Sequence, residues 1–108
     1  MAYNTELEKR IDASSLGWDP VKKNMFGGIG YMVQGNLAFG IHKDELIVRA
    51  SEDTATELLK RPGIRLFDMT GRPMKNWLMA APEAFRTDEQ LLALLQTGYK
   101  FAKSLPPK

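Results

Sequence analysis

The chain has 108 residues, with 15 lysines and arginines against 13 aspartates and glutamates, and it has no cysteine. This length suits a single domain with one hydrophobic core. The absence of cysteine excludes a disulfide framework, a thiolate metal site and a cysteine nucleophile. The net charge of +2 is too small to indicate nucleic-acid binding by itself. We expect one soluble domain, ordered over about residues 4–103.

The sequence shows no targeting or membrane-spanning pattern. Residues 1–6 lack the basic and then apolar run of a secretory signal. No apolar stretch approaches the ~20 residues that a helix needs to cross a bilayer. We therefore expect a cytoplasmic protein without membrane association.

The first predicted element is a helix over about residues 5–15. Thr5 and Glu8 have the spacing of a capping box. Ile11 continues the apolar face of the helix, and Gly17 ends it. A turn around a proline follows, because proline restricts both itself and its predecessor.

The next part of the chain changes to a period of two. Apolar residues alternate with small or polar ones at positions 29, 31 and 33 and again at 37, 39 and 41. Short polar or glycine-containing turns separate the runs. This pattern predicts an antiparallel meander, with strands at about 27–34, 37–42 and 45–50.

The second half of the chain predicts a helix, two strands and a final helix. Ser51 followed by two acids is typical of a helix start, and Pro62-Gly63 is typical of a stop. Thr87 and Gln90 form a second capping box. The expected bounds are about 51–61, 64–69, 74–80 and 88–103.

The predicted order is α-β-β-β-α-β-β-α. Short hairpins exclude an all-parallel sheet, because parallel pairs need long crossovers. Helices must cover one face of the sheet. The fold class is therefore α+β, a two-layer sandwich with a five-stranded antiparallel sheet.

A glycine cluster lies in the predicted meander, at positions 27, 28, 30, 35 and 40. Two pairs have the spacing of a phosphate-binding loop, but the lysine and the hydroxyl residue that such a loop requires are missing. We expect no nucleotide or other cofactor. The glycines more readily serve a bulge or a close approach of another segment to the sheet.

His42 is the single histidine and stands beside Asp44 and Glu45. These residues have no partner cluster elsewhere that would complete a metal site. A Ser-His-Asp triad assembles in space and stays open, although no serine lies in a nucleophile-elbow pattern. We expect an exposed turn histidine, no metal and no catalytic set, and keep a small-ligand binder or enzyme using His42 as a lesser alternative.

The charges are divided unevenly along the chain. Residues 1–54 carry 6 basic and 8 acidic side chains, and residues 55–108 carry 9 and 5. A possible binding patch consists of Lys60, Arg61, Arg65, Arg72 and Lys75. Such a patch could contact nucleic acid or an acidic protein, but a solvated sheet edge explains it as well.

One motif carries a family resemblance. Met25-Phe26-Gly27-Gly28-Ile29-Gly30, followed by Gly35 and Phe39, resembles the opening of the TfoX/Sxy amino-terminal domain family. Asp44 to Arg49 is similar to the next strand of that family, and Pro82-Glu83 and Leu91-Leu92 also fit. The resemblance covers about residues 5–103.

The resemblance implies an α+β fold related to secretion-chaperone-like domains. It also implies a regulator of natural competence that acts with the cyclic-AMP receptor protein at promoters, a role of members that carry a further carboxy-terminal domain. We expect a stand-alone amino-terminal domain that is a non-enzymatic interaction module. Its partner would be a protein, such as a transcription regulator, and a homodimer is left open.

Overall fold

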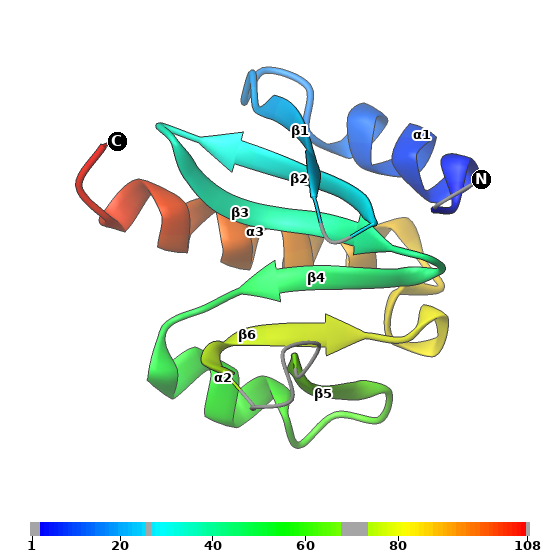
Figure 1. Cartoon of the computed structure of the whole chain (residues 1–108). Helices are drawn as coiled ribbons and strands as arrows, with labels where there is room; N and C mark the ends of the chain where they lie inside the picture. The colour runs from blue at the N-terminus through cyan, green and yellow to red at the C-terminus, as the bar shows by residue number, and fades with distance from the viewer. Residues whose placement is uncertain (1–2, 26, 68–73, 108) are drawn as a thin grey trace.

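The computed structural model describes residues 3–25, 27–67 and 74–107, with only the backbone of Met74 and Lys75 (Figure 1). In this part of the chain the elements are α1 (Thr5–Ser14), β1 (Val21–Met25), β2 (Gly28–Val33), β3 (Asn36–His42), β4 (Glu45–Arg49), α2 (Glu52–Leu58), β5 (Ile64–Phe67), β6 (Met74–Ala80), the 3-10 helix η1 (Pro82–Phe85) and α3 (Asp88–Ser104).

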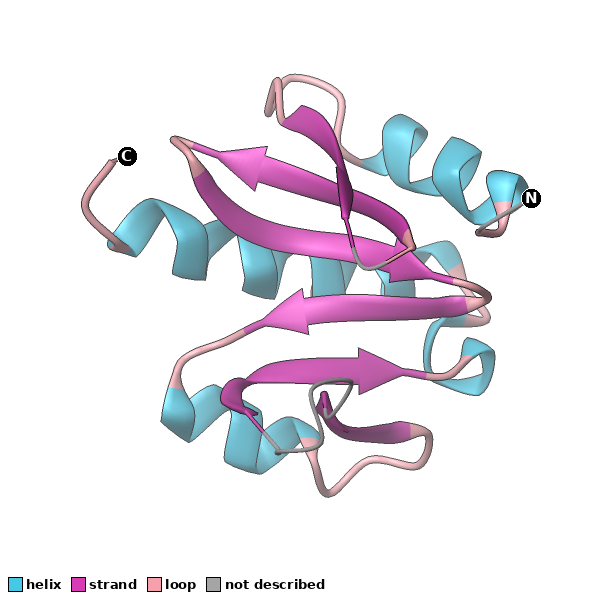
Figure 2. Cartoon of the chain, in the orientation of Figure 1, coloured by secondary structure: helices cyan, strands magenta, loops and turns pink. Residues whose placement is uncertain are grey.

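The strands form one sheet in the order β1-β2-β3-β4-β6-β5, and every neighbouring pair is antiparallel (Figure 2). The helix α3 crosses behind β3 and β4 in Figure 1. The predicted class, an α+β fold with an antiparallel sheet and helices on one face, is confirmed.

The prediction of five strands is wrong by one, because the described residues form six. The missed strand is β1, which pairs with β2 from Val21 opposite Met32 to Met25 opposite Gly28. Four of its five residues are exposed, so its sequence carries no alternation of apolar and polar residues. An edge strand outside the core gives no such signal.

Two helix ends differ from the predictions. The cap of α1 is Asn4 rather than Thr5, and its side-chain oxygen accepts from the backbone N–H groups of Glu6 and Leu7. Helix α2 ends at Leu58, three residues before the expected end. Pro62 disfavours helical backbone in the residue before it, so the last turn opens early.

Helix α3 follows its prediction closely. Thr87 accepts from the backbone of Gln90, and the Gln90 side chain accepts from the backbone of Thr87, which confirms the capping box. Gly98 lies directly against the backbone carbonyl of Ala38 on β3, where a Cβ atom would overlap that oxygen. This glycine therefore allows the helix to lie close to the sheet.

The apolar core lies between the sheet and the helices. Its largest fully buried side chains include Tyr31, Phe39, Ile11 and Leu95. A second, smaller cluster on the strands consists of Leu37, Ile47, Phe67 and Met79. No helix in the described part of the chain is long and apolar enough to cross a membrane.

Candidate functional site

Helix α1 and the edge strand β1 meet around the loop of residues 15–20. We call this region the α1–β1 corner and define it by Asp12, Leu16, Asp19, Val21 and Lys22. A shallow hollow of about 240 Å³ lies here, lined in part by Asp12, Leu16, Asp19 and Lys22. The corner therefore combines acidic, basic and exposed apolar side chains on one surface.

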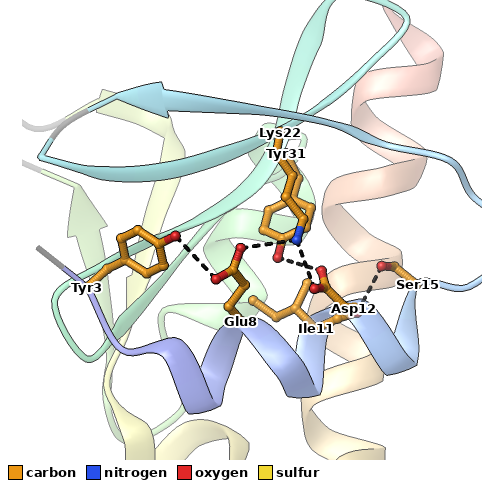
Figure 3. A network of polar contacts seen from close by, with 7 residues as sticks. All are labelled: Tyr3, Glu8, Ile11, Asp12, Ser15, Lys22 and Tyr31. Atoms are coloured by element: carbon orange, nitrogen blue, oxygen red, sulfur yellow. Dashed lines mark hydrogen bonds and ion pairs between the residues drawn. The ribbon is translucent and has the colours of Figure 1, made fainter. Parts of the chain in front are cut away.

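A polar network fastens β1 to α1 (Figure 3). The Lys22 ammonium donates to Oδ2 of Asp12 at 2.8 Å and to Oε2 of Glu8 at 3.0 Å. The hydroxyl of Tyr31 donates to Oδ1 of Asp12 at 2.9 Å, and that of Tyr3 donates to Oε1 of Glu8 at 3.2 Å. Each carboxylate thus has two donors, and the network joins α1, β1, β2 and the N-terminal segment.

The same contacts shift two ionisations in one direction. The hydrogen bond to Asp12 is the largest cause that raises the pKa of Lys22 above its ordinary value. Burial raises the pKa of Tyr31, and its hydrogen bond to Asp12 raises that pKa further. Both groups therefore keep their protons throughout the neutral range.

The loop at the corner is held in one conformation. Trp18 stacks on Tyr99 of α3, with ring centroids 4.5 Å apart and an angle of 16° between the planes. It also meets the edge of Phe39 at 6.3 Å. Gly17 and Asp19 both have positive φ, at 89° and 50°. The aromatic stack and the two left-handed residues fix the path from helix to strand.

Two large apolar side chains project into solvent at this corner. Leu16 is 80% exposed and Val21 is 65% exposed, and they stand near the two ends of the loop. The third such side chain among the described residues, Leu59 at the end of α2, is only 37% exposed. Exposed apolar groups next to an edge strand are candidates for part of a contact surface.

The glycine motif builds the β1–β2 hairpin rather than a ligand loop. Gly27 has φ of 70° in the turn. A Cβ on Gly28 would overlap the carbonyl oxygen of Ile41, and one on Gly30 would overlap the sulfur of Met25. Gly35, with φ of 81°, turns the chain from β2 to β3. Phe26 lies outside the described residues.

Three of the five residues of the possible binding patch have described side chains, and two of these three are paired with carboxylates. Lys60 pairs with Glu57 at 3.3 Å. Arg65 makes a bidentate pair with Glu45, at 2.5 and 2.7 Å. Arg61 is exposed and forms no ion pair with a described residue. Arg72 lies outside the described residues, as does the side chain of Lys75.

His42 stands at the end of β3, half-buried rather than fully exposed as expected. Its register partner Glu45 is engaged by Arg65, and this guanidinium lowers the pKa of Glu45. Among the residues the structure describes, no group of three histidines or carboxylates could hold a metal ion. His42 therefore lies opposite a residue, Glu45, that is held in an ion pair with Arg65.

The chain matches a known family over most of its length. The model of the TfoX N-terminal domain matches residues 17–102 of the chain. The chain therefore belongs to the TfoX N-terminal domain family. No curated protein matches the sequence.

Sequence reasoning did not single out the α1–β1 corner. Its polar network joins residues up to 28 positions apart, Tyr3 and Tyr31, and no spacing rule links a helix to a strand that was not predicted. One signal was available: Leu16 lies outside the apolar face of α1, and Val21 stands alone before two lysines. Apolar residues in such places have no core role to explain them.

Proposed function

We propose that this chain is a non-enzymatic protein-interaction module with a regulatory role of the TfoX type, and that it engages its partner through the α1–β1 corner. Family membership supports the regulatory role. The observation that carries the location is the pair of exposed apolar side chains, Leu16 and Val21, beside the open edge of β1.

The edge strand supplies the second part of the contact. Because β2 is the one described strand that pairs with β1, alternate backbone N–H and C=O groups of β1 point outward and can receive an added strand. Main-chain hydrogen bonds would provide affinity, and a partner's apolar side chains would cover Leu16 and Val21. The polar network keeps β1 in place, so little ordering is needed on binding.

The partner we propose is a cytoplasmic protein such as a transcription regulator, in keeping with the family. A second copy of the chain could use the same edge. In an antiparallel pair of β1 strands, Lys22 and Lys23 of both copies would lie close together, and like charges opposite one another are unfavourable. A different protein with acidic residues in its added strand fits β1 better.

Direct nucleic-acid binding through residues 60–75 is the alternative function. Two of its cations, Lys60 and Arg65, are already paired with carboxylates, which lowers the positive potential available to phosphates. A mobility-shift assay at ~50 mM salt, where even non-specific binders hold DNA, tests it. Retardation that weakens steeply with added salt would favour this alternative over the module.

The test of the proposed function compares surface variants in a pull-down from the native cell. Leu16→Asp and Val21→Asp place a charge in the apolar contact and should abolish capture of a specific partner. Leu59→Asp is the matched control, because it introduces the same charge at an exposed leucine outside the corner. Equal capture by the wild type and all three variants, each checked for folding by circular dichroism, would contradict the proposal.

A further inference from the structure

Arg49, the last residue of β4, is a half-buried cation with no counterion among the described residues. Its guanidinium forms no ion pair or hydrogen bond within the described residues, and its Nε is fully buried with no partner. Burial lowers the pKa of Arg49. Buried charges are normally paired, so an unpaired guanidinium in this place calls for a function or a ligand.

Two aromatic rings hold this guanidinium in place. Its central carbon lies 5.0 Å from the centre of the Trp77 ring on β6 and 4.9 Å from that of Phe101 on α3. Both distances are within the range of cation–π attraction. The rings orient the planar group but cannot accept its N–H hydrogen bonds in the plane, where an anion would be received.

A polar pocket of about 340 Å³ adjoins this position. It lies between the start of α2 and the last turns of α3, and its lining residues are Ser51, Thr54, Thr97, Lys100, Phe101 and Ser104. Phe101 is shared, because its ring meets Arg49 and also lines the pocket. Ser51, which also lines the pocket, follows Arg49 by two positions in the chain.

The pocket offers donors and acceptors in distinct places. The hydroxyls of Thr97 and Ser104 donate to helix carbonyls at 2.9 and 2.6 Å, and so present acceptor oxygens. The hydroxyl of Thr54 accepts from Ser51 at 3.0 Å and keeps its own hydrogen to donate. Lys100 adds an exposed ammonium. Lys100 and the hydroxyl of Thr54 therefore line a cavity of the size that small ligands occupy, ~300 Å³ or more, and the guanidinium of Arg49 lies against Phe101 in its wall.

We propose that this pocket, with Arg49 at its rim, binds a small molecule that carries a phosphate or carboxylate group. The oxyanion pairs with the guanidinium of Arg49 and the ammonium of Lys100. Polar groups elsewhere on the ligand donate to Thr97 and Ser104. None of these residues belongs to the α1–β1 corner, so the inference stands independently of the proposed docking of a protein there.

The experiment follows amide chemical shifts of the full chain by nuclear magnetic resonance while sodium pyrophosphate is added. Sodium chloride at matched ionic strength is the control for screening. The site predicts saturable shifts that centre on residues 49–54 and 97–104. Arg49→Met retains the stem between the two rings and should weaken binding by at least ~10-fold. Arg61→Met, which removes the same charge from an exposed site, should leave affinity unchanged.

Lys100→Gln keeps the proposal testable if Arg49→Met does not fold, since Lys100 is exposed on a helix. It too should weaken binding several-fold. A parallel titration with sodium citrate separates the two ligand chemistries: tighter binding of pyrophosphate indicates a phosphate ligand, and tighter binding of citrate a carboxylate one. Shifts with neither salt beyond those of sodium chloride would overturn the proposal, as would wild-type affinity in a folded Arg49→Met or Lys100→Gln.

Discussion

The ammonium of Lys22 on β1 lies 2.8 Å from Oδ2 of Asp12 on α1, and this ion pair ties the edge of the sheet to the first helix. A second ion pair of Lys22 with Glu8, the ladder with β2 and the packing of Met25 against the second apolar cluster also hold β1. The proposed docking surface therefore depends in part on a polar network that joins the strand to the helix.

Removing the cation tests this dependence. Lys22→Met should lower the free energy of unfolding by about 0.5–1 kcal/mol, because a part-exposed ion pair contributes little by itself but its loss leaves Glu8 and Asp12 close together without a counterion. Urea unfolding measures the change. Lys23→Met, next along the strand and exposed, is the control and should change stability by less than ~0.5 kcal/mol. Equal effects of the two variants would show that the network does not hold β1.

The pKa of Tyr31 predicts a loss of stability at alkaline pH. In the unfolded chain Tyr31 ionises near its ordinary pKa of 10.0, whereas burial and Asp12 hold its proton in the folded protein above that pH. Above pH 10, unfolding therefore releases a proton from Tyr31. The contribution of Tyr31 to the free energy of unfolding is fully present below pH 10 and is lost as pH rises further. Lys22, whose pKa is also raised from 10.5, adds to the same trend.

The variant Tyr31→Phe separates the contribution of the Tyr31 hydroxyl from that of the other groups that titrate at alkaline pH. It should cost about 1 kcal/mol near neutral pH, where one hydrogen bond is lost. It should also flatten the decline of stability between about pH 10 and 11.5. Urea midpoints for both proteins across this range provide the measurement. Parallel pH profiles would contradict the assignment of the decline to Tyr31.

The bidentate pair of Glu45 and Arg65 should make stability fall as pH is lowered, the opposite of the trend for Tyr31. The guanidinium lowers the pKa of Glu45 below its ordinary 4.5, so its contribution is present above that pH and is lost as pH falls through the folded pKa. The Glu45→Gln variant should therefore be less stable than the wild type at neutral pH. Its stability should also fall less than that of the wild type when the pH is lowered. Thermal unfolding at neutral pH and near pH 3 would reveal whether the two proteins converge.

Glycine is required at positions 27 and 28 of the hairpin for different reasons, and two substitutions distinguish them. Gly28→Ala forces a methyl group against the carbonyl of Ile41 and should cost about 1–3 kcal/mol, as overpacking does. Gly27 has a left-handed φ and open space around its α-carbon. Gly27→Asn should cost far less, because asparagine tolerates this region. Chemical denaturation that shows as large a cost for Gly27→Asn as for Gly28→Ala would refute this division.

The core and its elements were predictable because they follow periodic patterns. Phe39 and Val48 lie opposite one another on buried strands, as the alternation in the sequence indicates. The strand β1 could not be found this way, because Lys22, Lys23 and Asn24 are exposed and carry no period. The glycines of the β1–β2 hairpin allow β1 to pair with β2. The sequence predicted close packing for these glycines but not the strand that they admit.

The candidate sites were less accessible to sequence reasoning. The cluster of positive residues at 60–75 was visible in the sequence, yet the partner of Arg65 lies 20 residues away on β4. Arg49 was visible only as the last residue of a strand that resembles the family. Its lack of a counterion depends on three-dimensional placement next to Trp77 and Phe101. Such properties arise from tertiary contacts that no local pattern encodes.

The most direct test of the proposed docking surface is hydrogen–deuterium exchange of the chain alone and in complex with the partner that it captures. The outward-facing amides of β1 should exchange quickly in the free protein, because no described strand pairs with that edge. The account predicts that binding slows exchange in residues 16–25, and that Leu16→Asp prevents the change. Protection confined to β5, α2 or residues 97–104, with β1 unaltered, would contradict it.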